Sequence, residues 1–372
     1  MNVHFEDRRL LPIREKVEAG VRLSYEDAVT LYRTSDVLAL GYMANIVRER
    51  MHGDVTYFNV NRHINPTDVC VASCRLCAFG KQKRDPNSYT MSLEQVWETA
   101  GKGWSEQITE FHIVGGLHPE LNLDWFCKML SGLKERYPQI HLKAFTMVEI
   151  GYFARREKMS IRDVLIKLRD AGMDSMPGGG AEVFSERVRR IICDHKLTGD
   201  EWLETARIAH ELGVHSNCTM LYGHLENEED RADHLVKLRA LQDETKGFVT
   251  FIPLAFHPDN TALSHISKTT GFDDLKAIAV ARLVLDNIPH IKAYWVMLSA
   301  RIAQIALRFG ANDIDGTVVE EKIYHDAGST ESQALKRSDL LRLIRMAGRE
   351  PVERDTLYRP VTRTESAFTV LV

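Results

Sequence analysis

The sequence predicts an α/β fold, a closed (β/α)8 barrel of the TIM type. Eight short β-rich runs alternate with stretches whose apolar residues recur at helical spacing. This alternation favours parallel pairing, because parallel neighbours need a crossover connection, and eight such units are enough to close a barrel. No Ser/Gly-rich linker or low-complexity segment divides the 372 residues. We therefore expect one barrel with extensions at both ends.

The chain divides into three expected segments. Residues 1–54 carry helical spacing, and Ser24, Glu26 and Asp27 form a group like a capping box, so an N-terminal helical cap is predicted. The barrel is expected over residues 55–330, and residues 331–372 are expected to form a helical and irregular extension packed on it. The eight predicted strands lie in residues 57–65, 110–116, 141–147, 172–180, 214–223, 248–258, 291–298 and 311–319.

Charge and hydropathy exclude several classes of partner. The 48 basic and 52 acidic side chains nearly balance, so no global field would attract nucleic acid or an anionic membrane surface. No window approaches the roughly 18 consecutive apolar residues that a membrane span requires. The charged opening "MNVHFEDRRL" does not resemble a signal peptide, so a cytoplasmic location is expected. An anionic substrate would then have to be bound by local charges.

Three of the six cysteines stand together in "CVASCRLCAFG", residues 70–80, directly after the first predicted strand. In a barrel of this type the active site lies in the loops at the carboxyl ends of the strands. A disulfide is disfavoured in a cytoplasmic chain, a structural zinc would need a fourth ligand such as His63, and a C-x-x-C thiol pair would leave Cys70 unused. Three thiolates on one loop suit a 4Fe-4S cluster that keeps one iron open for a non-protein ligand. The predicted ligands are Cys70, Cys74 and Cys77.

The remaining cysteines are scattered along the chain. We expect them to pack as small apolar side chains, since none belongs to a spaced ligand pattern. They are Cys127, Cys193 and Cys218.

The C-x3-C-x2-C loop after the first barrel strand, with an aromatic at Phe79, resembles the signature of the radical S-adenosylmethionine (SAM) superfamily. The resemblance implies a cluster whose open iron takes the amino and carboxylate groups of SAM. It also implies that the run "HIVGG" meets the methionine part of SAM through Gly115 and Gly116, because glycine lets the backbone approach closely. The run "PGGGAEVF" would contribute further contacts to SAM from Gly179, Gly180 and Glu182, although a surface carboxylate after a turn is an alternative for Glu182.

More of the chain resembles one branch of this superfamily, the radical SAM enzymes of menaquinone and deazaflavin-cofactor biosynthesis. The most specific run is "DGTVVEEKIYHDAG", residues 315–328, which resembles the aminofutalosine synthase family. That family joins the 5′-deoxyadenosyl group of SAM to 3-[(1-carboxyvinyl)oxy]benzoate, with migration of the aryl group and loss of a carboxyl carbon. The resemblance thus implies SAM as a co-substrate and an electron donor such as flavodoxin or ferredoxin as a partner.

The expected substrate is a dicarboxylate, and a buried anion needs paired donors. Basic residues at predicted strand ends are therefore candidates for the substrate pocket, and Glu320 or Glu321 could orient a histidine there. Each candidate has a structural alternative, such as bracing a loop or lying on a solvated helix face. The candidates are His118, His257, Arg301 and His325.

Two alternatives to this function remain open. Another enzyme of the same branch, either the dehypoxanthine futalosine cyclase or the deazaflavin-cofactor synthase component, would use the same cluster with a different substrate. A non-catalytic zinc-binding module would use the cysteines structurally.

Overall fold

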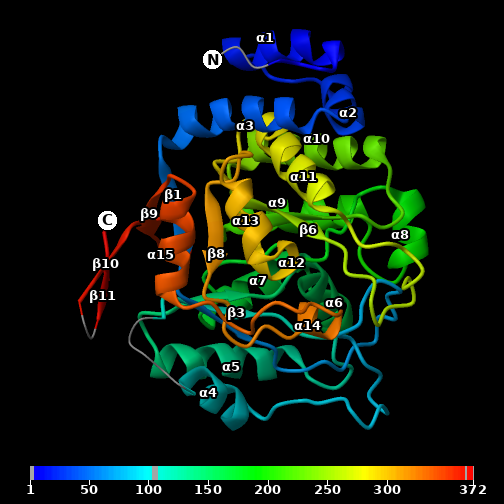
Figure 1. Cartoon of the computed structure of the whole chain (residues 1–372). Helices are drawn as coiled ribbons and strands as arrows, with labels where there is room; N and C mark the ends of the chain where they lie inside the picture. The colour runs from blue at the N-terminus through cyan, green and yellow to red at the C-terminus, as the bar shows by residue number, and fades with distance from the viewer. Residues whose placement is uncertain (1–3, 103–107, 365–366, 372) are drawn as a thin grey trace.

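The computed structural model describes residues 4–102, 108–364 and 367–371 and contains the predicted closed barrel (Figure 1). We use stave for each of the eight strand positions around the barrel. The first stave consists of β1 (Val55–Asn59) and its continuation β2 (Asn61–Ile64). It pairs with β3, β3 pairs with β4, and isolated bridges at Ser175 and Met176 supply the fourth stave. All these pairs are parallel, and β8 returns to β1 to close the ring. The other strands are β3 (Glu110–Ile113), β4 (His141–Ala144), β5 (Ser216–Tyr222), β6 (Phe248–Ala255), β7 (His290–Ile291) and β8 (Asp313–Gly316).

The seventh predicted strand is shorter than expected. Pairing along residues 291–298 ends with β7 and a bridge at Lys292, and α12 (Trp295–Leu298) follows. All four residues of α12 are buried, and the indole Nε1 of Trp295 donates to the carbonyl of Gly316 at 2.9 Å. A short apolar run predicts burial but does not distinguish a buried strand from a buried helix.

Many of the helices around the barrel begin at residues whose side chains accept a backbone N–H. Ser92, Thr146, Thr198, Asn227 and Thr270 each form a capping box with the third helical residue. These caps satisfy donors that a helix start otherwise leaves unpaired. The helices are α4 (Leu93–Gly101), α5 (Leu123–Arg136), α6 (Met147–Glu157), α7 (Ile161–Asp170), α8 (Glu186–Ile192), α9 (Gly199–Glu211), α10 (Glu228–Thr245), α11 (Gly271–Val284), α13 (Ala300–Ala306), α14 (Ile323–Asp326) and α15 (Arg337–Met346).

The N-terminal residues form a short 3-10 turn, η1 (Arg8–Leu10), and three helices, α1 (Leu11–Ala19), α2 (Tyr25–Arg33) and α3 (Val37–His52). The structure contains the capping box of Ser24 and Asp27 that the sequence indicates. The three helices stack at one edge of the molecule, where α3 packs on α11 and α2 packs on α10 (Figure 1). They therefore cover the flank of the barrel.

The C-terminal residues contain strands in addition to the helical and irregular structure that the sequence predicts. Besides α15 they form β9 (Glu350–Glu353), which pairs in parallel with β1, and a hairpin of β10 (Val361–Arg363) and β11 (Phe368–Val370). The segment after β9 closes the amino-terminal end of the barrel. Arg354 Nε donates to Asp313 Oδ2 at 2.6 Å, and Thr356 Oγ1 donates to Glu110 Oε2 at 2.6 Å. Because Asp313 and Glu110 begin β8 and β3, these contacts seal the floor of the barrel.

Among the described residues, no helix combines the length and the apolar character that crossing a membrane requires.

We predict that Arg354→Met destabilises the fold strongly. Both side chains of the Arg354–Asp313 ion pair are inaccessible to solvent, so the substitution leaves a buried carboxylate without its partner. Removing one partner of such a pair costs about 3–5 kcal/mol. The measurement is the urea midpoint of the purified protein. Arg190→Met is the control, because Arg190 pairs with Glu186 on the surface and its loss should leave the midpoint almost unchanged. Equal midpoints for the two variants would contradict the proposed importance of the floor.

Candidate active site at the carboxyl ends of the strands

A cavity of about 280 Å³ occupies the end of the barrel where the strands terminate. Its walls come from the loops after the strands and from inward-facing side chains within the strands. The residues that the sequence indicates for a cluster and for SAM lie in this wall. They are Cys70, Cys74, Cys77, Phe79, Gly115, Gly116, Gly179, Gly180 and Glu182.

The cysteine loop has a defined shape. The N–H of Cys77 donates to the carbonyl of Cys74 at 3.1 Å, and the N–H of Gly80 donates to Cys77 Sγ at 3.3 Å. The buried carboxylate of Asp68 anchors the loop, because it accepts from Lys81 Nζ at 2.9 Å and from the N–H of Tyr89 at 2.7 Å. The three thiols therefore face the cavity from a braced loop.

The donor set and the packing around it fit an iron–sulfur cluster. A Cβ added to Gly80 would lie 3.2 Å from Cys70 Cβ and 3.6 Å from Cys77 Sγ, so glycine keeps space beside two of the thiols. Among the described residues, no three potential ligands stand together as they would around a single metal ion. In a 4Fe-4S cluster each cysteine binds a different iron, so its ligands need not converge on one point. Bound there, such a cluster supplies the low-potential electron that cleaves SAM.

The glycines after β3 allow two backbone segments to meet. A Cβ at Gly116 would lie 2.3 Å from the carbonyl oxygen of Val69, which excludes any larger residue. The N–H of Gly115 donates to Glu149 Oε1 at 3.2 Å, and the other oxygen of Glu149 accepts from Thr146 at the start of α6. Burial raises the pKa of Glu149 to about 7. A cation bound in the cavity near this carboxylate would favour its ionised form.

The run after the fourth stave packs equally closely. Gly178 has φ +77°, and a Cβ there would lie 2.0 Å from the carbonyl oxygen of Asn217. Gly180 also has positive φ, and so does Glu182, for which this conformation is uncommon. The carbonyl of Glu182 is held by the N–H of Leu221 at 2.8 Å. The backbone thus aims the Glu182 side chain into the cavity.

Glu182 is not the surface carboxylate of the alternative interpretation, because it is buried and paired with Lys196. Lys196 Nζ lies 2.6 Å from Glu182 Oε1. Burial raises the pKa of Glu182, but the charge of Lys196 outweighs it, so the pKa lies below its usual value. The same pair keeps the pKa of Lys196 well above its ordinary value despite burial. Both residues therefore carry charge in the wall of the cavity.

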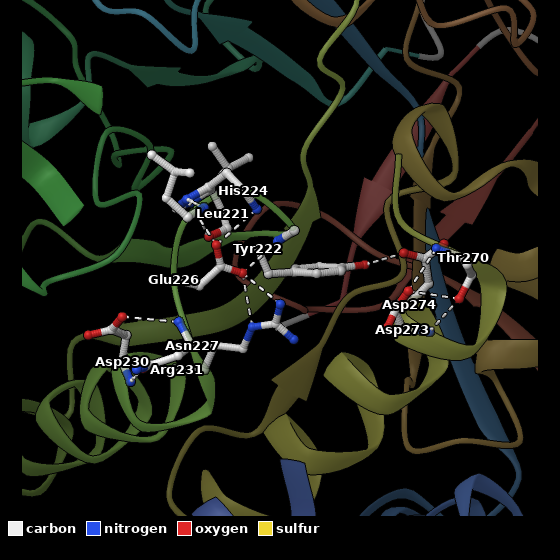
Figure 2. Close-up of polar contacts among 12 residues, drawn as sticks. Leu221, Tyr222, His224, Glu226, Asn227, Asp230, Arg231, Thr270, Asp273 and Asp274 are labelled. Carbon is white, nitrogen blue, oxygen red and sulfur yellow. Dashed lines mark hydrogen bonds and ion pairs between the residues drawn. The ribbon is translucent and has the colours of Figure 1, made fainter. Parts of the chain in front are cut away.

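The loop after β5 is held in place by the polar contacts that Figure 2 shows. The carboxylate of Glu226 accepts from the N–H groups of Gly223 and His224 at 2.6 and 2.9 Å and from Arg231 at 2.7 Å. Burial raises the pKa of Glu226, but His224 and Arg231 outweigh it and bring the pKa to about 2. Next to this network, the hydroxyl of Tyr222 donates to a carboxylate of α11. The loop is therefore held from two sides.

Of the four residues predicted to contact the substrate, only His257 lies in the described cavity wall. His257 Nε2 is 3.0 Å from the carbonyl of Met297, and its Nδ1 is buried without a partner in the described structure. His118 instead braces its loop by accepting two backbone N–H groups at Nδ1. Arg301 is exposed on α13.

His325 lies behind the cavity wall. Its Nδ1 is 3.2 Å from Glu321 Oε2, and its Nε2 is 3.1 Å from the carbonyl of Glu331. Glu321, which the sequence suggested as a residue that orients a histidine, therefore does so, and it also lines the cavity. His325 is placed to hold Glu321 and the loop, and it does not face the cavity.

Several cavity residues were not identified from the sequence as part of a substrate pocket, although His63 was named there as a possible zinc ligand. Lys292 follows β7, His63 and His112 lie within β2 and β3, and Lys196 and Glu149 come from segments between strands. One signal was available: a lysine and histidines at inward positions of otherwise buried strands need a functional or paired environment.

Comparisons with known proteins agree with this geometry. Residues 64–238 match the family model described as the radical SAM superfamily, and residues 245–367 match the model described as the CofH/MqnC C-terminal region. Two relatives are aminodeoxyfutalosine synthases. The one from Thermus thermophilus is 47% identical, with 95% of this chain and 96% of the relative covered, and the one from Streptomyces coelicolor is 46% identical, with 93% and 92% covered.

A relative with another activity is also similar. The 5-amino-6-(D-ribitylamino)uracil--L-tyrosine 4-hydroxyphenyl transferase of Methanopyrus kandleri is 42% identical, with 86% of this chain and 88% of the relative covered. Among solved structures, methylornithine synthase superposes with a TM-score of 0.73 at 18% identity, with 91% of this chain and 97% of that chain covered, and so supports the fold. The cysteine loop, the barrel and the 47% identity to a relative over 95% of the chain lead to one assignment. This chain belongs to the radical SAM superfamily, in the branch that includes the aminodeoxyfutalosine synthases and the CofH/MqnC enzymes.

Proposed function

We propose that this protein catalyses the aminodeoxyfutalosine synthase reaction in menaquinone biosynthesis. It would join the 5′-deoxyadenosyl group of SAM to 3-[(1-carboxyvinyl)oxy]benzoate, with migration of the aryl group and loss of one carboxyl carbon. The observation that carries the proposal is one cavity that unites the three-cysteine loop and Glu182 with Lys292 and a histidine pair inside the barrel. The relatives from Thermus and Streptomyces support this reaction over the other activities of the branch.

The residues of the chain have separable tasks in this proposal. The three cysteines hold the cluster, and the glycine segments leave room for SAM against the backbone. Glu182 offers an ionised carboxylate to the ribose or the amino group of SAM. The cluster and SAM together supply the 5′-deoxyadenosyl radical, which reacts with almost any nearby C–H bond.

The remaining task is to exclude water and competing groups. Apolar side chains of β6 and its loop, including Ile252, Leu254 and Phe256, line the cavity together with Tyr294 and Tyr324. An enclosed apolar wall holds the substrate against the adenosyl carbon and keeps other reaction partners away. We also propose that flavodoxin or ferredoxin reduces the cluster and that the protein works in the cytoplasm.

An anaerobic assay with SAM, a reductant and the enol-ether benzoate tests the proposed function. The expected product is aminodeoxyfutalosine, identified by mass spectrometry together with methionine. Parallel assays with dehypoxanthine futalosine, and with tyrosine plus 5-amino-6-(D-ribitylamino)uracil, separate this reaction from those of related enzymes. Product from either of these substrates, and none from the enol ether, would refute the proposal. A colourless, zinc-containing protein would refute the cluster as well.

We predict that replacing any one of the three cavity cysteines by alanine abolishes product. Each substitution removes a thiolate ligand, so both the iron content and reductive SAM cleavage should fall to background. Iron, sulfide and 5′-deoxyadenosine are measured on anaerobically purified protein. Alanine variants of Cys127, Cys193 and Cys218 are the controls, because these residues lie outside the described cavity wall and should show packing losses at most. A Cys74→Ala protein with full iron content and activity would contradict the assignment.

We predict that Glu182→Gln weakens SAM binding about tenfold or more and leaves iron and sulfide content unchanged. The substitution keeps the shape of the side chain but removes the charge that strengthens a hydrogen bond to SAM. Equilibrium dialysis with labelled SAM gives the dissociation constant. Glu186→Gln is a matched control, because Glu186 is exposed at the start of α8. Unchanged SAM affinity in Glu182→Gln would remove Glu182 from the SAM site.

A further inference from the structure

The interior of the barrel below the cysteine loop carries a pair of stacked histidines. His63 in β2 and His112 in β3 are direct partners in the parallel register. Their ring centroids lie 4.4 Å apart and the ring planes are almost parallel, with an interplanar angle of 1°. Both rings line the cavity, and His63 is buried while His112 is half-buried. Burial lowers the pKa of each histidine, and their mutual proximity lowers the pKa of His112 further. The pair is therefore neutral at neutral pH.

One ring nitrogen of this pair is both buried and without a partner among the described residues. His63 Nε2 is buried, and no hydrogen bond to it exists within the described structure. An unpaired polar atom in an apolar wall costs free energy, unless a ligand or water satisfies it. Because His63 also lines the cavity, the nitrogen is available to a bound molecule.

The adjacent cation is Lys292, at the inner end of the same cavity. Its Nζ lies 2.8 Å from Asp315 Oδ1, and both side chains are almost completely buried. This is the one hydrogen bond of the ammonium group within the described structure, although an ammonium group has three donors. Asp315 has φ +66°, in the left-handed region that only a few per cent of non-glycine residues adopt. The chain thus holds a lysine with unused donors at the cavity wall.

The position of these groups along the cavity sets which part of a substrate they can reach. His63 and His112 lie within strands and Lys292 directly follows one, whereas the cysteines lie in a loop beyond the strand ends. The cluster and SAM would therefore bind at the mouth of the cavity, and the substrate would extend into its interior.

We infer that Lys292 and His63 form a subsite for the aromatic carboxylate of the substrate, with Asp315 and His112 as positioning residues. The inference rests on the proposed function and extends it to the orientation of the substrate. The vinyl carbon must meet the adenosyl carbon at the mouth, so the ring carboxylate, at the other end of the molecule, extends toward Lys292. A carboxylate there accepts from the free N–H groups of Lys292 and from His63, which satisfies the unpartnered nitrogen.

The test compares two ligands that differ in the ring carboxylate. Binding of 3-[(1-carboxyvinyl)oxy]benzoate and of 2-phenoxyacrylate, which lacks that group, is measured by equilibrium dialysis on the cluster-containing protein with SAM and without reductant. Lys292→Met should weaken binding of the benzoate about thirtyfold or more. It should change binding of 2-phenoxyacrylate by less than about threefold. His63→Gln should show the same selectivity with a smaller loss, and it decides the matter if Lys292→Met fails to retain its iron.

Lys268→Met is the matched control, because Lys268 also pairs with an aspartate, Asp259, but on the surface. It should bind both ligands as the unaltered protein does. Equal losses for the two ligands in the Lys292 and His63 variants, or no loss for either, would overturn the subsite. Because binding is measured without turnover, the experiment can refute the proposed reaction and the proposed subsite independently of each other. Selective binding without aminodeoxyfutalosine formation would refute only the reaction, and product formation with an unchanged KM in both variants would refute only the subsite.

Discussion

The carboxylate of Asp313, the first residue of β8, connects the floor of the barrel with its cavity. One oxygen accepts from Arg354 of the C-terminal segment at 2.6 Å, and the other accepts from the N–H of Asp315 at 2.6 Å. Burial raises the pKa of Asp313, but Arg354 and Lys292 outweigh it and bring the pKa to about 2. A charge in this position is tolerated only because it is paired and hydrogen-bonded. The bond to Asp315 holds that residue in its unusual conformation, which in turn places Lys292 at the cavity wall.

This arrangement shows how the C-terminal residues complete the barrel. The barrel interior contains charged side chains, among them the ion pair of Glu110 and Lys143 with a distance of 2.8 Å. Such an interior needs a closed floor that excludes water and supplies partners for the buried polar groups. Thr356 bonds to Glu110, and the ring of Tyr358 stacks on His290 at 3.5 Å. Polar and charged side chains are thus present both at the floor and at the cavity.

At the mouth of the cavity, close packing of backbone segments holds the structure together, as ion pairs do at the floor. Gly116 lies against the carbonyl of Val69, and Gly178 lies against the carbonyl of Asn217, so backbone segments of neighbouring barrel strands meet without side chains between them. The cysteine loop and the Glu182 segment can therefore share one cavity wall. The glycine runs were recognisable in the sequence because consecutive glycines at strand ends are typical of places where a backbone or a ligand approaches closely.

The sequence by itself determined the barrel, its order of strands, the position of the three-cysteine loop and the glycine segments. These features depend on local spacing, such as C-x3-C-x2-C and the alternation of strand and helix, which a linear pattern records directly. Only the tertiary structure decided which basic residues face the cavity. Arg301 and His118 follow strands in the sequence, yet one lies on an exposed helix face and the other braces its own loop. Lys292 and His63 face the cavity because strand register and barrel closure turn them inward, and these depend on pairing between residues far apart in the chain.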